Sequence, residues 1–515
     1  MRLFRCAVTI EPARPFRLLD PGVYAKSSIG SKRGEFFESS GMKSGVDSEN
    51  LYQIFESQGP TALDWRESTP DQRCQRILRL REAVLDHRED WYRAAQEDFR
   101  KSAGEVDLAE LLPFCLEANQ ALRQLRQWMR PRSVRPTWLT LGTRAQIRLQ
   151  SRGRCLIIGP FNYPINLTLS PLVSALAAGN TAIVKPSELT PALSGLLARV
   201  IAQVFAPQEV AVVQGSAEVA QALQDLPFDH VHFTGSTAVG KKVMASAARH
   251  LASLTLELGG KSPAIVDASA DLALAARNLV WAKFANAGQT CIAPDHVFVH
   301  ESVKARLLEL CQKEIERAYG SSLLEQERGG ILTHIINPRH LSRLRQLLEQ
   351  ARESGARVLV GGQVGAESNF MAPTLIDEPP AQTRIMQEEV FGPLLPVVAF
   401  SQWDGLVERL NAGPKPLALY LYSRTPRHID QLLLKTRSGG VCINHALVHY
   451  LHGGLPFGGI NESGIGQSRG FYGFRSFSHE RAILETRWPW SVRLLSAGTI
   501  PTWMRSLIRW GWRRL

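Results

Sequence analysis

Short apolar runs alternate with helical stretches over most of this 515-residue chain, and this alternation limits the folds open to it more than any other feature. Runs such as RCLIIG, TAIVK, EVAVV and HVHFTG lie between residues 154 and 258 and end at or beside Gly, Pro or Ser. Apolar runs without polar alternation are typical of parallel strands covered on both faces. The sequence therefore predicts a doubly wound α/β unit, in which ligands bind beyond the carboxyl ends of the strands.

A second α/β series follows LTLELGGK and contains SPAIVDA, HVFVH, RVLVGG, LLPVVAF and ALYLYS. Two consecutive series predict two doubly wound lobes with a cleft between them. The basic stretch from Trp128 to Gly153 alternates polar and apolar residues as an edge hairpin does. We predict a first lobe from residues 51–128 and 153–257 with part of 440–473, and a second lobe from residues 258–439.

The two ends of the chain fall outside these lobes. Residues 1–50 are polar and lack the apolar core of a secretory signal, so they are predicted to be a disordered extension, or to precede a true start at Met42. Residues 486–515 are rich in Arg and Trp and contain no acidic residue. On a helical projection from Thr502 one side is basic, which fits a helix at an anionic membrane surface and equally a tail that packs on a partner subunit.

Composition narrows the classes of partner and compartment. The formal net charge of +12 is concentrated in two acid-free blocks, which favours contact with an anionic surface. The seven cysteines form no CxxC pair, which favours a reducing compartment and disfavours disulfides or zinc. His445, His449 and His452 lack an acidic partner, so we expect no metal site. We also expect no nucleic-acid partner and a cytoplasmic location, at the membrane face if the tail binds lipid.

Three residues could perform acyl-transfer chemistry together. Cys291 in GQTCIAP is a loop thiol able to attack a carbonyl, and Glu257 in LELGGK is a carboxyl able to move protons for the thiol and then for water. Asn162 in GPFNYP could donate its amide to the oxyanion that forms. Each has an ordinary alternative: a buried thiol, a strand-end Glu paired with Lys261, and a turn-forming Asn.

Three further segments are candidates for binding a dinucleotide. FTGSTAVGKK is a strand, a turn and a helix start, where Ser236 would cap the helix and free amides would face a diphosphate. Lys185 and Glu188 follow the strand TAIV and could bond ribose hydroxyls. Glu389 and Phe391 in EEVFGP could reach across the cleft to a ribose and a nicotinamide ring. The alternatives are a plain turn, surface charges, and a solvated Glu beside a core Phe.

The chain resembles the aldehyde dehydrogenase superfamily over roughly residues 51–484. GPFNYP, VKPSE, FTGSTAVG, LELGGK, GQTC, EEVFGP and LPFGG…SGIG occur in that family's order. GQTCIAPD, the NYP turn and FRSFSH are most similar to the class-three branch of fatty and coniferyl aldehyde dehydrogenases. The resemblance implies NAD(P)-dependent oxidation of a hydrophobic, fatty or aromatic, aldehyde to the carboxylic acid. It also implies a homodimer, with residues 129–152 and 474–485 forming a small β oligomerisation element.

The resemblance also implies a role for each matching position. Cys291 would form a thiohemiacetal and then a thioester, Asn162 with the Cys291 amide would hold the oxyanion, and Glu257 would activate the hydrolytic water. The cofactor residues implied are Lys185 and Glu188 at the adenosine ribose, Gly235, Ser236, Thr237, Ala238, Val239 and Gly240 at the diphosphate, and Glu389 and Phe391 at the nicotinamide. A carboxylate at Glu188 would repel a 2′-phosphate, so NAD is favoured, with NADP still compatible.

Two rival functions remain open at this point. A CoA-acylating dehydrogenase would pass the thioester to CoA, and it could dispense with the hydrolytic base that Glu257 supplies. A non-catalytic, membrane-associated scaffold of the same fold would not need Asn162, Glu257 and Cys291 together.

Overall fold

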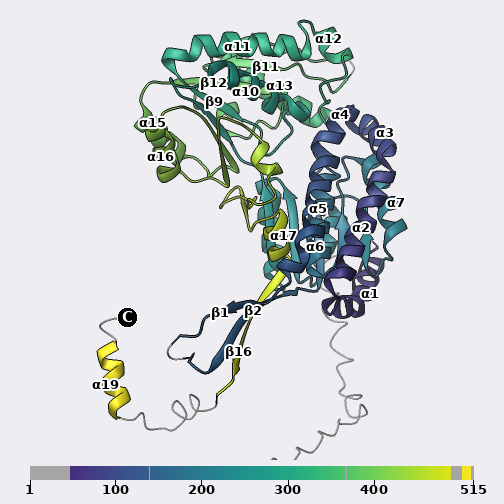
Figure 1. Cartoon of the computed structure of the whole chain (residues 1–515). Helices are drawn as coiled ribbons and strands as arrows, with labels where there is room; N and C mark the ends of the chain where they lie inside the picture. Colours follow the sequence, from purple (N-terminus) through teal and green to yellow (C-terminus); the bar gives the residue numbers. More distant parts are fainter. Residues whose placement is uncertain (1–46, 138–139, 366–367, 489–501, 512–515) are drawn as a thin grey trace, which may run out of the picture. The chain divides into compact units, whose positions relative to one another are not determined.

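Two open α/β sheets and one small antiparallel sheet organise the chain, which confirms the predicted fold class (Figure 1). The structure is a computed structural model that describes residues 47–137, 140–365, 368–488 and 502–511. The predicted extension before residue 47 therefore lies outside the described residues. So do Trp138 in the hairpin and residues 489–501 and 512–515 of the tail.

The first sheet has six strands in the order β15-β7-β6-β3-β4-β5. Its strands are β3 (Arg154–Ile158), β4 (Thr181–Lys185), β5 (Val210–Val212), β6 (His230–Gly235), β7 (Ser253–Leu258) and β15 (Gly464–Ile465). Neighbours from β7 to β5 are parallel, and β15 joins the edge antiparallel to β7. The helices between them are α6 (Asn166–Ala178), α7 (Pro191–Val204), α8 (Ala217–Gln224) and α9 (Thr237–Ala248). The apolar runs predicted as strands are strands, because burial on both faces removes the need for polar alternation.

The second sheet has seven strands in the order β10-β11-β12-β9-β8-β13-β14. They are β8 (Pro263–Val266), β9 (His296–His300), β10 (Arg357–Val360), β11 (Thr374–Asp377), β12 (Leu394–Phe400), β13 (Ala418–Tyr422) and β14 (Gly440–Ile443). All neighbours are parallel except β10 and β11. Because β14 pairs with β13, this sheet extends past residue 439, where we had expected the lobe to end.

The helices of the second lobe connect the strands of the second sheet. They are α10 (Leu272–Phe284), α11 (Glu301–Tyr319), α12 (Leu323–Arg328), α13 (Pro338–Glu353), α14 (Arg384–Gln387), α15 (Trp403–Ala412) and α16 (Pro426–Lys435). Leu279, Phe284 and Tyr420 are among the buried side chains of the core that these helices share with the sheet. Helices α10 and α11 pack against each other.

The N-terminal helices pack on the helices of the first sheet, and α3 and α7 lie side by side (Figure 1). The helices are α1 (Ser48–Arg66), α2 (Pro70–Asp86), α3 (Arg88–Phe99), α4 (Ala103–Val106), the π-helix Asp107–Leu111 and α5 (Leu112–Trp128). Thr69 and Gln72 form a capping box that fixes the start of α2. Helix α1 begins at Ser48, so the last residues of the segment 1–50 are helical.

The third sheet consists of β1 (Arg132–Val134), β2 (Thr143–Ser151) and β16 (Ser478–Thr486), all antiparallel. The edge hairpin predicted between Trp128 and Gly153 is therefore present. Helix α17 (Gly470–Ser476) precedes β16, and helix α19 (Thr502–Gly511) lies in the tail. No helix in the described ranges is long and apolar enough to cross a membrane.

Candidate active site

Cys291 and Glu257 both line a cavity of about 340 Å³. Its polar lining includes Tyr163, Thr290 and Ser468. Most of the remaining surface is apolar, with Leu108, Pro113, Leu167, Pro171, Trp281 and Phe284 among the lining residues. The two candidate reactive groups therefore face a space suited to a hydrophobic ligand.

Glu257 lies near the end of β7, where its backbone pairs with Gly464 on one side and Thr234 on the other. The Ser468 hydroxyl donates a hydrogen bond of 2.7 Å to Glu257 Oε1. Within the described part of the chain, the buried Oε2 has no hydrogen-bond partner. Burial raises the pKa of Glu257 to about 8, against the lowering effects of Ser468 and Arg469. This carboxyl can thus act as a proton acceptor near neutral pH.

The alternative pairing of Glu257 with Lys261 is wrong. Lys261 forms an ion pair with Asp295 and donates to the main-chain oxygen of Ile385 at 2.7 Å. Asp295 in turn accepts from the main-chain N–H of Val390. Lys261 therefore ties the segment after β7 to the loop carrying Glu389 and leaves Glu257 free of a lysine partner.

The loop before Cys291 has an unusual backbone. Asn286, Ala287 and Gly288 all have positive φ angles of 53°, 52° and 72°. Consecutive left-handed residues are costly for side chains with a Cβ, so surrounding contacts must hold them. A Cβ at Gly288 would meet the main-chain oxygen of Gly392 at 2.2 Å, which explains the glycine. The Asn286 side chain donates 2.9 Å to the main-chain oxygen of Asn162 and so fixes the loop.

The Cys291 thiol is protonated at neutral pH in this environment. Burial, and then the charges of Glu389 and Glu257, raise the pKa of Cys291 to about 12. The main-chain N–H groups of Cys291 and Ile292 act in the opposite direction because they stabilise a thiolate. A nearby base must therefore remove the proton before the sulfur can act as a nucleophile.

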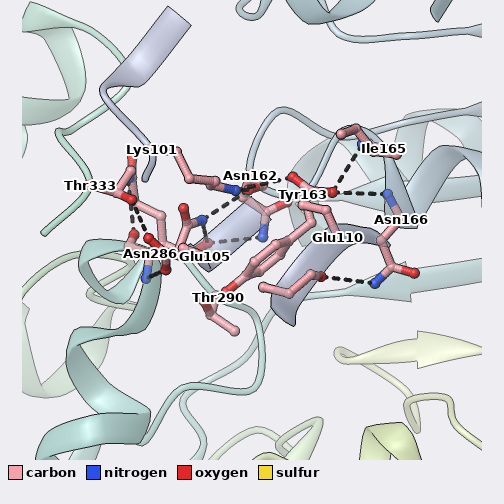
Figure 2. Close-up of polar contacts among 12 residues, drawn as sticks. Lys101, Glu105, Glu110, Asn162, Tyr163, Ile165, Asn166, Asn286, Thr290 and Thr333 are labelled. Atoms are coloured by element: carbon pink, nitrogen blue, oxygen red, sulfur yellow. Dashed lines mark hydrogen bonds and ion pairs between the residues drawn. The ribbon is translucent and has the colours of Figure 1, made fainter. Parts of the chain in front are cut away.

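Asn162 lies beside the Cys291 loop, within the network drawn in Figure 2. Its side-chain amide donates 2.9 Å to the main-chain oxygen of Gln289, two residues before the cysteine. One amide hydrogen makes this bond, and the NH₂ group carries a second. Its own main-chain oxygen accepts from Lys101 Nζ at 2.9 Å. Asn162 can therefore hold the turn through its main-chain oxygen and also donate hydrogen bonds from its side-chain amide.

A buried ion pair supports this turn from behind. Lys101 Nζ lies 3.1 Å from Glu110 Oε1, and both side chains are buried (Figure 2). Glu110 Oε2 accepts from the main-chain N–H groups of Ile165 and Asn166, where α6 begins. The carboxylate thus anchors the helix start that follows the Asn162 turn.

The predicted diphosphate segment lies at the carboxyl end of β6. Ser236 caps α9, and its hydroxyl accepts from Val239 N at 3.4 Å. A Cβ at Gly235 would meet the Phe233 ring at 2.5 Å, so the turn requires glycine. Gly240 is buried against Leu258. Together these contacts place the first amides of α9 at the strand-end edge where the fold class binds ligands.

The predicted ribose-binding pair lies at the end of β4. Lys185 Nζ donates 3.0 Å to Glu188 Oε2 and 2.8 Å to the main-chain oxygen of Pro186. The lysine is buried, whereas the glutamate side chain is 44% exposed. The exposed carboxylate is therefore the member of the pair that can meet a ligand.

Glu389 reaches from the second lobe to the segment after Glu257. A Cβ at Gly259 would meet a Glu389 carboxylate oxygen at 2.2 Å, and Glu389 Oε1 is buried without a partner among the described residues. Burial raises the pKa of Glu389 to about 7. Of the alternative, a solvated Glu pair, the Glu388 side chain is 43% exposed, whereas Glu389 is half-buried. Phe391, with a positive φ of 47°, packs edge-on against Phe161 at 5.8 Å.

Several cavity residues were missed in the sequence. Tyr163 OH lies 2.7 Å from the Thr290 hydroxyl beside the cysteine loop. The buried Arg469 lies 3.5 Å from Glu117 and stacks over the Tyr450 ring at 4.4 Å. Tyr163 could have been found as the neighbour of Asn162 in GPFNYP. Ser468 and Arg469 had no signal, because more than two hundred residues separate them from Glu257.

The histidines considered for a metal have other contacts. His449 Nδ1 lies 3.2 Å from the Cys442 sulfur, and its ring is 6.0 Å from that of Phe457. Among the residues that the structure describes, no group of three or more His, Cys, Asp and Glu is arranged to hold a metal ion.

Comparison with known proteins gives one consistent family. Residues 45–483 match the model of the aldehyde dehydrogenase family. A putative aldehyde dehydrogenase AldX of Bacillus subtilis is 40% identical over 84% of this chain and 97% of the relative. The 4,4'-diaponeurosporen-aldehyde dehydrogenase of Staphylococcus aureus is 37% identical over 80% and 88%. Aldehyde dehydrogenase family 3 member B1 of Rattus norvegicus is 40% identical over 80% and 86%. A solved structure of Staphylococcus aureus AldH in a substrate-bound state has a TM-score of 0.81 at 35% identity, covering 84% and 93%.

Proposed function

This chain belongs to the aldehyde dehydrogenase family, and from that premise we propose that it oxidises a hydrophobic aldehyde to the carboxylic acid through covalent intermediates on Cys291. It is an oxidoreductase acting on aldehydes, and its cofactor is NAD or NADP. The observation that carries the finer proposal is the shared cavity: Cys291 and Glu257 line one apolar space, and Glu257 Oε2 has no partner among the described residues.

The residues present fit a nicotinamide dinucleotide. Glu389 Oε1 is a buried acceptor without a described partner, and the first amides of α9 follow the carboxyl end of β6, where a diphosphate can accept hydrogen bonds from them. We propose that Glu188, with Lys185, meets the adenosine ribose, that residues 235–240 meet the diphosphate, and that Glu389 with Phe391 holds the nicotinamide ribose and ring. When bound, the nicotinamide ring accepts the hydride that leaves the aldehyde carbon.

The first chemical step belongs to Cys291 and Asn162. Glu257 accepts the thiol proton and releases it to solvent, and the sulfur attacks the aldehyde carbon to form a thiohemiacetal. The second hydrogen of the Asn162 amide and the Cys291 main-chain N–H stabilise the oxyanion. Loss of hydride converts the thiohemiacetal to a thioester on the same sulfur.

The second step belongs to Glu257. Its unpartnered Oε2 accepts a proton from water, and the hydroxide attacks the thioester carbon. The carboxylic acid is released, and the Cys291 sulfur leaves as the thiolate. A pKa of about 8 keeps a useful fraction of Glu257 ionised at neutral pH while making it a stronger base than an exposed carboxylate.

Measuring NADH formation over aldehydes from acetaldehyde to hexadecanal, with aromatic members and with or without CoA, tests this proposal. We expect higher kcat/KM for the hydrophobic aldehydes and no requirement for CoA, because Glu257 is present as a hydrolytic base. A requirement for CoA would favour the acylating alternative. No turnover with any aldehyde would favour the scaffold alternative.

We also propose which segments of the chain form each lobe. Residues 51–128 and 153–257, with part of 440–473, form the cofactor lobe, and residues 258–439, together with β14, form the catalytic lobe. Residues 129–152 and 474–485 form a dimerisation element, which is supported by the long pairing of β2 with β16 and by its exposed strands.

The tail is proposed to bind an anionic membrane at its cytoplasmic face. Helix α19 carries exposed Trp503, Arg509 and Trp510, the residue types that favour the headgroup layer. The cysteines in the described ranges are free thiols, which supports a reducing compartment.

A further inference from the structure

A basic pocket lies where β2 and β16 meet the first lobe, away from Cys291 and the cofactor residues. It is lined by Arg66 at the end of α1, by Gln150, Ser151 and Arg152, by Asp229 before β6, and by His479 and Arg481 of β16. Its volume is about 360 Å³. Three arginines and one histidine thus line the same pocket as a single carboxylate residue, Asp229.

Most N–H groups of these three guanidinium groups make no hydrogen bond or ion pair with the described residues. Within the described ranges, the side chains of Arg66 and Arg481 make no hydrogen bond or ion pair, and Arg152 uses Nε on the main-chain oxygen of Ser476 at 2.9 Å. Asp229 Oδ2 already accepts from Arg154 N at 2.7 Å. The pocket therefore contains hydrogen-bond donors that have no acceptor among the described residues.

The strand register adds a second observation. Arg481 of β16 lies directly opposite Arg148 of β2. Like charges in directly opposed positions destabilise a sheet, and an anion beside them would reverse the effect. Neither arginine has an ion-pair partner among the described residues.

We propose that this pocket binds a phosphate-bearing anion, either free phosphate or the phosphate of a lipid headgroup. Arg66, Arg152 and Arg481 supply charge-assisted donors. This site is separate from the proposed catalytic function, so aldehyde oxidation serves only to show that variants are folded.

Calorimetric titration of the NAD-saturated enzyme with inorganic phosphate at constant ionic strength tests the proposal, because bound NAD occupies the α9 site. We expect saturable binding with Kd below about 1 mM in the wild type. In Arg66→Gln/Arg481→Gln the affinity should fall at least tenfold, as loss of hydrogen bonds to a charged group implies. Arg130→Gln/Arg132→Gln, which removes two exposed arginines outside the pocket, should bind as the wild type does.

Absence of saturable binding in the wild type, or equal affinity in the pocket and control variants, would overturn the proposal. Flotation with phosphatidylcholine vesicles, with and without phosphatidic acid, identifies the source of the phosphate. Reduced flotation of the pocket variant relative to the control variant assigns a lipid headgroup. Unchanged flotation together with lost phosphate binding assigns the free anion.

Discussion

At Glu257, burial and hydrogen bonding act in opposite directions on one carboxyl group. Burial raises the pKa of Glu257 to about 8, while the Ser468 hydroxyl and the charge of Arg469 hold it from rising further. The hydroxyl bonds Oε1 and leaves Oε2 free for water among the described contacts. In the proposed mechanism, Ser468 thus acts through Glu257 and is a positioning residue.

Ser468→Ala should shift the pH dependence of hydrolysis to higher pH. Without the donor, the ionised form of Glu257 loses stabilisation, so the pKa rises by about one unit. Hydrolysis needs the ionised form, so turnover below pH 8 falls while turnover well above that pH changes little. The measurement is the pH profile of steady-state NADH formation under conditions where hydrolysis limits turnover.

Ser468→Thr is the matched control, because it keeps the hydroxyl. Its pH midpoint should stay near that of the wild type. A midpoint in Ser468→Ala equal to the wild-type value would contradict the role given to this hydroxyl.

Short motifs in the sequence predict Cys291, Glu257 and Asn162 as site residues, but the contacts that hold these residues could not be predicted. Cys291 and Glu257 line one cavity, and the Asn162 side chain donates to the main chain of the loop that carries Cys291. The partners of Glu257 come from a segment that meets β7 only through β15, so no local spacing reveals them. Such contacts depend on how segments far apart in the sequence pair in the folded chain.

At the scale of elements, the ion pair of Lys101 and Glu110 joins the α3–α5 region to the start of α6. The pair is buried, and each member makes a second bond, to the oxygen of Asn162 or to the amides of Ile165 and Asn166. Removing one charge would leave the other buried without compensation.

Lys101→Met should destabilise the protein by about 3–5 kcal/mol, as expected when one partner of a buried ion pair is lost. The readout is the midpoint of urea unfolding followed by tryptophan fluorescence. Lys101→Met/Glu110→Gln should lose less stability than Lys101→Met alone, because no charge is left unpaired. A double variant at least as unstable as the single variant would contradict this explanation.

Element prediction succeeded for most of the strands in the two large sheets, including the short strands β5, β8 and β10. β11 and β14 were not expected, although both lie in the second sheet. Their four-residue segments, TLID and GVCI, show no periodicity that distinguishes them from a loop. Their strand state depends on the neighbours β12 and β13, which the local sequence does not encode.

At the scale of the whole molecule, the proposal to test is that the tail binds an anionic membrane. A chain ending at Thr486 should lose flotation with anionic vesicles and keep aldehyde oxidation, because α19 lies outside both lobes. Flotation of full-length and shortened protein with the same vesicles provides the comparison. Equal recovery of both proteins in the unbound fraction would contradict membrane binding by the tail.

The most direct test follows the acyl group itself. Glu257→Gln, incubated with hexadecanal and NAD⁺, should release NADH in a burst and accumulate an acyl group on the peptide that contains Cys291, detected by mass spectrometry after digestion. Cys291→Ala should give neither the burst nor the adduct. NADH formation by Cys291→Ala, or a burst in Glu257→Gln without any acyl mass on the Cys291 peptide, would contradict the account.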